Sequence, residues 1–331
     1  MKHFCVMPWY SREINLKTQQ DSICCWLQKS ISRSRLQQDF IDNKQSEACQ
    51  KCWHLEDSGI ESRRQMENRF LDFALDKNIE VIADNIHDAE PMLYQFNLGS
   101  LCNSTCITCG ANASSAWQGL LKKQIKISSE NSRIDRNFDH YQSTINWKTI
   151  KRINLLGGEP LLIEKSFAIL DMLLLNGNTD CLVSFVTNGS VTLTKKHIDT
   201  FAKFSNISCC VSIDGTDKLF EYVRYPLSWD RTLTNIDQYR QIFREVVVSY
   251  TISNLNIHDK QNTVNWFNQQ GLLYIENYVQ YPAYFNHTVQ PGHALWPKFV
   301  EAITTQDKIK GISVNDYVPY LSNLLQSNPL D

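Results

Sequence analysis

The sequence has no long apolar run and no excess of charge of either sign. No stretch of its 331 residues approaches the ~20 apolar residues of a membrane-spanning helix. The opening segment, MKHFCVMPWYSREINL, also lacks the apolar run of a signal peptide. The 33 basic and 35 acidic residues give a formal net charge of -2, which provides no overall field to hold a polyanion. We therefore expect a cytoplasmic protein with no membrane partner, and the charge disfavours a nucleic-acid partner.

Histidine motifs and low-complexity segments are absent as well. The eight histidines show neither HxH nor HExxH spacing, so they do not predict a histidine metal site. With 42% hydrophobic and 11% aromatic residues, the chain can bury a sizeable core. It is expected to form one large domain, or a large and a small one.

Cysteine is abundant, and its eleven residues fall into three groups. Reducing compartments seldom keep structural disulfides and the count is odd, so ligation of a metal or cluster is the natural alternative. The groups are Cys5, Cys24, Cys25, Cys49 and Cys52 near the start, Cys102, Cys106 and Cys109 in LCNSTCITCG, and Cys181, Cys209 and Cys210 in apolar runs. The last group is interpreted as core, because buried cysteine often behaves as a small hydrophobe.

From about residue 92, short apolar segments alternate with helical patterns. The expected strands are 93–99, 152–156, 181–188, 207–214, 245–253 and 272–280. The five expected helices between them are 113–124, 165–176, 193–204, 232–243 and 259–270. Strands joined by helical crossovers predict an α/β fold with a mostly parallel sheet, open or closed into a barrel. In such folds the reactive groups collect at the C-terminal ends of the strands.

The expected domains are 1–58, 59–91, 92–281 and 282–331. The first is rich in cysteine and poor in periodic segments, which indicates a small module held by a metal rather than by a core. The second is a linker with a helix over 59–77, the third contains the sheet, and the last is a helical tail. The polar segment 126–146 is expected to be an insertion or a mobile loop.

Cys102, Cys106 and Cys109 directly follow the first expected strand, on the loop that enters a helix. A structural zinc ion commonly takes four ligands in two close pairs. Three clustered thiolates can instead hold a 4Fe-4S cluster that leaves one iron open to another ligand. We favour the cluster, and the alternative is a zinc ion completed by a distant residue.

The spacing C-x3-C-x2-C after the first strand resembles the radical S-adenosylmethionine (SAM) enzymes. LLGGEPLL, residues 155–162, is similar to the Gly-Gly-Glu-Pro motif of that superfamily. The residues themselves suggest that Gly157 and Gly158 let the backbone pass close to a ligand, while Glu159 offers a carboxylate to an ammonium group. The resemblance implies a partial (βα)6 TIM-like barrel, SAM chelated at the open iron, and a loop through Pro160 that holds the SAM amino group. Thr108 departs from the apolar or aromatic residue usual before the third cysteine.

Polar residues at later strand ends are further candidates on the same resemblance. FVTNGS ends the third expected strand and SIDG ends the fourth, and the SAM or substrate candidates there are Thr187, Asn188, Ser212 and Asp214. Arg224 is a candidate bidentate clamp for the SAM carboxylate. The structural alternatives are strand-terminating turns and, for Arg224, an exposed helix arginine. Asn254 and Asn256 are weaker candidates for the adenosine site.

The N-terminal segments FCVMPWY, SICCW and EACQKCW resemble the cluster-binding segments of radical SAM proteins with a SPASM or twitch module. This resemblance implies that Cys5, Cys24, Cys49 and Cys52 hold an auxiliary 4Fe-4S cluster. Cys25 is an alternative to Cys24, which we prefer because neighbours on a strand face opposite ways. A zinc site with four thiolates fits the same spacings.

The resemblance implies an enzyme that reductively cleaves SAM to a 5'-deoxyadenosyl radical, which abstracts hydrogen from the substrate. The expected substrate is a peptide or protein, as in the maturation of ribosomally made peptides, and the electron donor is a protein such as flavodoxin or ferredoxin. One alternative is a small metabolite, nucleotide or sugar as substrate. Another is a zinc-stabilised binding protein without catalysis.

Overall fold

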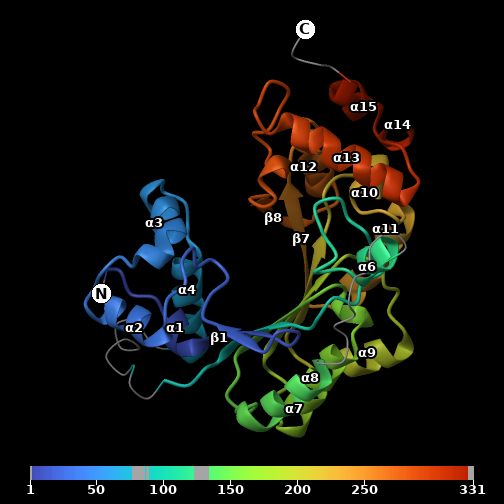
Figure 1. Ribbon diagram of the computed structural model, residues 1–331. Helices are drawn as coiled ribbons and strands as arrows, with labels where there is room; N and C mark the ends of the chain where they lie inside the picture. Colours follow the sequence, from blue (N-terminus) through green and yellow to red (C-terminus); the bar gives the residue numbers. More distant parts are fainter. Residues whose placement is uncertain (1, 77–85, 87–88, 123–133, 327–331) are drawn as a thin grey trace. The chain divides into compact units, whose positions relative to one another are not determined.

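The computed structural model describes residues 2–76, 86, 89–122 and 134–326 (Figure 1). The strands are β1 (Ser11–Asn15), β2 (Gln20–Ser22), β3 (Leu93–Asn97), β4 (Arg152–Leu156), β5 (Leu182–Thr187), β6 (Ile207–Ser212), β7 (Glu245–Ile252) and β8 (Leu273–Tyr278). The helices up to β6 are α1 (Met7–Tyr10), α2 (Arg33–Ile41), α3 (Gln50–Asp57), α4 (Arg63–Leu75), α6 (Ser115–Lys122), α7 (Ile134–Thr144), α8 (Glu164–Leu175) and α9 (Lys195–Phe201). The later ones are α10 (Asp217–Val223), α11 (Trp229–Ile242), α12 (Lys260–Gln269), α13 (Trp296–Lys310), α14 (Val314–Tyr317) and α15 (Pro319–Gln326).

The sheet is open and mostly parallel. Its strand order is β2-β1-β3-β4-β5-β6-β7-β8, so β2 and β8 are its two ends. β5, β6, β7 and β8 pair in parallel, β1 pairs in parallel with β3, and β2 runs antiparallel to β1. The α/β prediction and the six expected strands from β3 to β8 are confirmed. β1 and β2 were not expected from the sequence.

The chain divides into two compact units. The first comprises Met1–Asn97, Arg133–Asn154 and Asp171–Leu182, and the second comprises Leu98–Ser132, Leu155–Leu170 and Val183–Asp331. These units are groups of residues that contact one another more than they contact the rest of the chain. They do not test the predicted domain boundaries at residues 58, 91 and 281, which stay a prediction. Within the parts of the chain that the structure describes, no helix combines the length and apolar character needed to cross a bilayer.

The first unit has a hydrophobic core around its N-terminal segment. Phe4, Val6 and Phe40 are almost completely buried in one cluster, which Leu71 of α4 and Leu93 of β3 complete. The expectation that the N-terminal segment lacks a core is therefore wrong. Its apolar residues are scattered along short elements, and part of the core comes from beyond residue 58, so local periodicity does not detect it.

The polar segment 126–146 contains a helix where a loop was expected. Residues 126–133 lie outside the described part of the chain, and α7 follows them. Phe138 and Tyr141, three positions apart on α7, are 2% and 4% exposed. The Asn137 side chain donates a hydrogen bond to the Leu16 carbonyl at 2.7 Å. Over residues 134–144 the alternative of a mobile loop is wrong, because these few residues are enough to anchor a helix that is otherwise polar, and the alternative of an insertion stays a prediction.

In the second unit, helices cover one face of the parallel strands. Phe185 of β5 packs against Phe201 of α9, and Tyr250 of β7 packs against Phe267 of α12. Alternate strand residues point to the other face, where side chains are partly exposed. Cys210 lies on that face and is half-buried, so its interpretation as core is wrong, whereas Cys209 is buried as expected.

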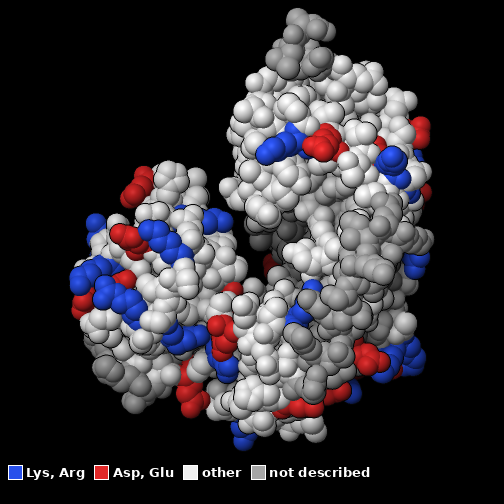
Figure 2. Space-filling model, viewed as in Figure 1, with Lys and Arg blue, Asp and Glu red and all other residues white. Residues whose placement is uncertain are grey.

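Acidic and basic residues are interspersed over the face shown in Figure 2, with apolar and neutral side chains between them. On this face the charges of the two signs are mixed, in keeping with the small net charge of the sequence, and they form no large patch of one sign.

Candidate functional site

The first three candidate ligands lie on the loop between β3 and α6. The Ser104 hydroxyl is 3.2 Å from the Cys102 Sγ and 3.4 Å from the Cys106 Sγ, so both thiols face one hydroxyl. Burial, followed by the negative charge of Cys106, raises the pKa of Cys109 to about 11. Burial also raises the pKa of Cys106. The structure thus brings the three thiols together in a buried site, where water screens the charges of thiolates poorly.

Backbone hydrogen bonds fix the shape of this cysteine loop. The N–H groups of Thr105 and Ile107 donate to the carbonyls of Tyr225 and Val223 at 2.6 and 2.8 Å. The Thr105 hydroxyl donates to the same Tyr225 carbonyl at 3.0 Å. The loop is therefore held against the last residue of α10 and the segment after it, which contains Arg224.

The Gly-Gly-Glu-Pro loop packs directly on the cysteine loop. The Gly158 N–H donates to the Gly99 carbonyl at 2.9 Å, and the Glu159 N–H donates to the Leu101 carbonyl at 2.7 Å. A Cβ at Gly158 would lie 2.3 Å from the Leu101 oxygen and 2.8 Å from the Cys102 Cβ. Glycine is thus required at position 158 for the contact between the two loops. The approach of a ligand to Gly157 and Gly158 stays a prediction.

Glu159 joins the ends of β4 and β5. It is fully buried, and its Oε1 accepts hydrogen bonds from the Thr187 hydroxyl at 2.8 Å and the Leu161 N–H at 3.1 Å. Its Oε2 accepts from the Asn188 N–H at 2.7 Å. Burial raises the pKa of this carboxyl, against the effect of these donors. A carboxylate offers about four lone-pair sites, and donors in the described part of the chain occupy three of them.

Pro160 is buried at the start of a short 3-10 helix, Pro160–Leu162, and its carbonyl accepts a hydrogen bond from the Ser166 hydroxyl at 2.6 Å. This contact anchors the Gly-Gly-Glu-Pro loop to the beginning of α8. The part of Pro160 in binding SAM stays a prediction.

The end of β5 reaches the cysteine loop through amide side chains. The Asn188 Nδ2 donates to the Asn103 Oδ1 at 2.9 Å and lies 3.8 Å from the Cys102 Sγ. The Asn103 Nδ2 donates to the Ser190 hydroxyl at 2.8 Å. Asn103, Ser104 and Ser190 were missed as site residues, although all three lie inside motifs that the sequence singles out. Their side chains gain this role only when the two loops meet.

Arg224 and Asp214 form a buried ion pair. The Arg224 guanidinium lies 2.8 Å from the Asp214 Oδ2, and the Thr251 N–H donates to the Asp214 Oδ1 at 3.1 Å. Arg224 caps the end of α10 and is 9% exposed, so the alternative of an exposed helix arginine is wrong. Its buried Nε has no hydrogen-bond partner among the described atoms. A bound anionic group is a natural partner for that N–H.

The other strand-end candidates differ in what they offer. Ser212 is half-buried at the end of β6, on the face that the helices leave uncovered. Asn256 is fully buried, and its Nδ2 donates to the carbonyls of Asp214 and Thr251 at 2.7 and 2.8 Å. Asn254 donates to the Tyr284 carbonyl at 2.9 Å. Asn256 therefore braces the chain around Asp214, whereas Asn254 holds the segment that follows β8.

A second group of thiols lies in the first unit. Cys5, Cys24, Cys49 and Cys52 line one small cavity together with Arg63 and Arg64. Burial raises the pKa of Cys24 and of Cys49 to about 12. These thiols are therefore protonated in the metal-free chain, and a bound metal must displace their protons.

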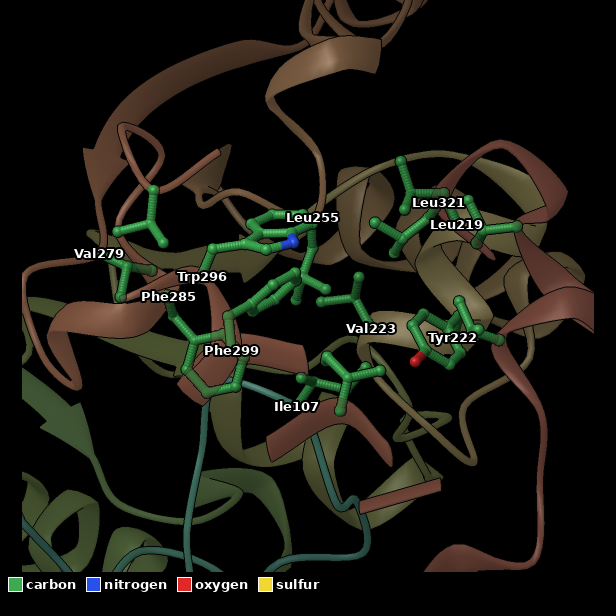
Figure 3. Close-up of a cluster of buried hydrophobic side chains, with 14 residues drawn as sticks. Ile107, Leu219, Tyr222, Val223, Leu255, Val279, Phe285, Trp296, Phe299 and Leu321 are labelled. Atoms are coloured by element: carbon green, nitrogen blue, oxygen red, sulfur yellow. The ribbon is translucent and has the colours of Figure 1, made fainter. Parts of the chain in front are cut away.

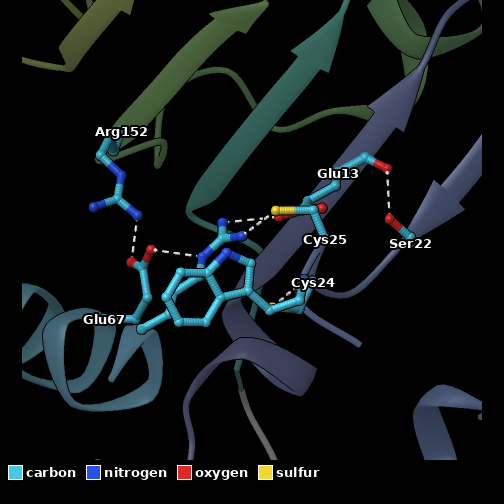
Figure 4. A network of polar contacts seen from close by, with 8 residues as sticks. Glu13, Ser22, Cys24, Cys25, Glu67 and Arg152 are labelled. Carbon is cyan, nitrogen blue, oxygen red and sulfur yellow. Dashed lines mark hydrogen bonds and ion pairs between the residues drawn. The ribbon is translucent and has the colours of Figure 1, made fainter. Parts of the chain in front are cut away.

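Cys25 is exposed, and its sulfur contacts the Arg63 guanidinium (Figure 4). The premise that Cys24 and Cys25 lie on a strand is wrong, because β2 ends at Ser22. The preference for Cys24 has a different basis, since Cys24 lines the cavity. Arg63 also pairs with Glu13 at 2.8 Å, so Cys25 lies at the edge of an ion-pair network that connects β1 with α4.

Residues 96–267 match the family model of the Radical SAM superfamily. The chain belongs to this superfamily. No curated protein matches the chain.

Solved structures similar to the chain include native anSMEcpe with bound AdoMet, at 13% identity and a TM-score of 0.40 over 66% of this chain and 62% of that one. Streptococcus suis SuiB bound to S-adenosylmethionine is 13% identical, with a TM-score of 0.43 over 84% of this chain and 60% of that one. Streptococcus suis SuiB bound to precursor peptide SuiA is 12% identical, with a TM-score of 0.43 over 93% and 71%. The chain thus spans less than two thirds of anSMEcpe.

The radical SAM superfamily implies an iron–sulfur cluster and SAM, and the residues present fit a cluster. Cys102 and Cys106 both face the Ser104 hydroxyl, and Cys109 lies on the same short loop, so three thiols are available as ligands. Among the residues described, no three Cys, His, Asp or Glu side chains are arranged to hold one metal ion.

Proposed function

We propose that the chain is a radical SAM enzyme that cleaves SAM reductively and uses the 5'-deoxyadenosyl radical to abstract hydrogen from a peptide or protein. The observation that carries the proposal is the direct contact between the cysteine loop and the Gly-Gly-Glu-Pro loop. A zinc-stabilised protein without catalysis needs no such contact.

Each group in this site has a proposed task. Cys102, Cys106 and Cys109 would hold the SAM-site cluster, which together with SAM supplies the one-electron cleavage when bound. Glu159 would accept a hydrogen bond from the SAM ammonium, and Arg224, fixed by Asp214, would donate its free Nε–H to an anionic group. Asn188, Thr187 and Ser212 would orient SAM or the substrate at the strand ends.

We propose that the cavity lined by Cys5, Cys24, Cys49 and Cys52 holds an auxiliary 4Fe-4S cluster, which would assign the chain to the SPASM or twitch group. Four thiols around one cavity, two of them buried and two half-buried, support this proposal. They also leave zinc as the alternative occupant. A protein such as flavodoxin or ferredoxin is the proposed source of electrons.

A substrate segment without charge is the best match to the uncovered face of the sheet. Val186, Cys210, Val247 and Leu273 lie side by side across four strands on this face. Leu273 and Ile275 of β8 are 61% and 56% exposed. β8 is an end strand, where an extended peptide can add alongside the sheet. We therefore favour a peptide over a small metabolite, nucleotide or sugar.

The cofactor proposal is tested by measuring iron, sulfide, zinc and 5'-deoxyadenosine in anaerobically reconstituted protein with dithionite and SAM. We expect about eight irons per chain, falling to about four in Cys49→Ala/Cys52→Ala. Replacing Cys102, Cys106 and Cys109 by alanine should abolish 5'-deoxyadenosine formation. Cys25→Ala, at an exposed thiol outside the cavity, is the matched control and should leave both readouts unchanged. Zinc without iron would select the non-catalytic alternative.

The substrate class is tested with extract of the host cell. A peptide or protein substrate should stimulate 5'-deoxyadenosine formation when the extract has been dialysed, and protease treatment should abolish the stimulation. Stimulation by the small-molecule filtrate alone would instead favour a metabolite.

A further inference from the structure

Helix α13 forms one wall of the cysteine loop, although it lies beyond residues 96–267 that match the family model. Ile107, in the middle of the loop, is fully buried in a cluster with Val223 and Phe299 (Figure 3). The Gln306 side chain donates a hydrogen bond to the Ile107 carbonyl at 3.0 Å. The C-terminal part of α13 is therefore held close to Cys106 and Cys109.

Lys310, the last residue of α13, is a buried cation on this wall. It is 9% exposed, and its ammonium lies 4.8 Å from the centre of the Trp117 ring. The Trp117 Nε1–H donates to the Cys106 carbonyl at 3.0 Å, which places the ring against the cysteine loop. The Lys310 Nζ also donates to the Gln306 Oε1 at 3.3 Å.

No carboxylate in the described chain lies within ion-pair distance of Lys310. The nearby Asp307 accepts hydrogen bonds from the Tyr222 hydroxyl at 3.0 Å and the Val314 N–H at 2.8 Å. Burial of an ammonium without a paired anion is unfavourable. Burial lowers the pKa of Lys310 to about 8, and the negative charges of Cys106, Asp307 and Cys109 oppose that effect.

Arg224, the other cation near the thiols, differs in this respect, because Asp214 already neutralises it. Lys310 has no such ion pair among the described residues, so its charge can act on the thiolates as well as on Asp307. Three thiolates and a cubane carry net negative charge, and reduction adds one more electron.

We propose, on the basis of the proposed function, that Lys310 is a positioning residue that stabilises negative charge at the Cys102–Cys106–Cys109 site and raises the reduction potential of a cluster bound there. The reaction affected is the uptake of one electron from dithionite or a low-potential electron-transfer protein, in which no bond forms or breaks. A positive charge held in a poorly screened site favours the reduced form.

The test compares Lys310→Met with Lys308→Met in the full chain, reconstituted anaerobically at pH 7. Lys308 is exposed on the same helix, so its substitution removes the same charge from a screened position. Potentiometric titration followed by EPR should show a more negative midpoint potential in Lys310→Met and no change in Lys308→Met. Lys310→Arg, which retains the charge, should restore most of the wild-type potential. An unchanged midpoint potential in Lys310→Met at full iron content would overturn the proposal.

Two further measurements keep the outcome interpretable. The titrations are repeated in the Cys49→Ala/Cys52→Ala background, so that only the cluster of the cysteine loop contributes to the EPR signal. If Lys310→Met binds no iron, recovery of iron in Lys310→Arg supports a role for the positive charge. Failure of Lys310→Arg to recover iron shows a purely structural role and overturns the proposal. Wild-type protein that binds iron but does not cleave SAM would refute the proposed function and leave the comparison of potentials intact.

Discussion

Gly158 is the residue at which the two motif loops come closest. Its backbone lies against Leu101 and Cys102, and its N–H is used in a hydrogen bond to Gly99. A side chain at this position has no space, because its first carbon would overlap the Leu101 carbonyl. The glycine therefore controls the position of a candidate metal ligand.

Replacing Gly158 by alanine is expected to move the cysteine loop. Overpacking of this kind costs about 1–3 kcal/mol of stability, and the shift of Cys102 should lower the iron content of the cysteine-loop site. Iron analysis and denaturant unfolding of the variant measure the two effects. Gly119→Ala on α6 is the control, since nothing lies within 4 Å of its added carbon. Equal iron content in both variants would contradict the role of Gly158.

At the scale of elements, the regular part of the fold could be predicted and the N-terminal part could not. The strand expected at 152–156 is β4 without change of bounds, because its apolar residues lie between clear turn signals. β1 was not predicted because it contains a buried charged residue. Glu13 is 6% exposed and pairs with Arg63 of α4. No local pattern shows that the counter-ion of a buried glutamate lies fifty residues away.

The candidate site shows the same limit. The cysteines, Glu159, Asp214 and Arg224 could be named as candidates from the sequence, because they lie in or beside recognisable motifs and strand ends. Lys310 could not, because the hydrogen bond that brings its helix to the loop joins Gln306 to Ile107, 199 positions apart. Only the folded chain brings this cation to the Trp117 ring that contacts the cysteine loop.

Helix α7 allows a direct test of an element that the sequence did not predict. Phe138 is 2% exposed, and its replacement by alanine should lower the free energy of unfolding by about 3–5 kcal/mol. Asp139→Ala, at the exposed neighbouring position, should change it by less than about 0.5 kcal/mol. Urea unfolding provides the measurement. A mobile loop would give equal, small effects for both variants.

At the scale of the whole molecule, buried thiols link stability to pH. Burial raises the pKa of Cys5, Cys24, Cys49, Cys106, Cys109, Cys181, Cys209 and Cys210 above 9.0, the ordinary value for a thiol. Above that pH the unfolded chain releases these protons while the folded chain retains them. The unfolded state then binds fewer protons, so the free energy of unfolding falls as the pH rises.

We expect metal-free protein to keep its stability from pH 7 to about pH 8 and to lose stability as the pH rises above about 9, in anaerobic urea unfolding with a phosphine reductant. Lys310, whose lowered pKa acts in the opposite direction, is a single group against many thiols. Cluster-loaded protein should show a smaller loss, because its ligand thiols have already released their protons. Stability that increased over this pH range in the metal-free protein would exclude buried, protonated thiols.

The hydrogen bond between Ile107 and Gln306 also bears on the order of events in the cell. A ribosome makes the cysteine loop long before it makes α13, because 199 positions separate the two partners. Until then Ile107 lacks the cover of Phe299, and the thiols lack Lys310. A cluster delivered earlier to the nascent chain would enter a loop that α13 does not yet cover, so cluster insertion is expected to follow the synthesis of α13.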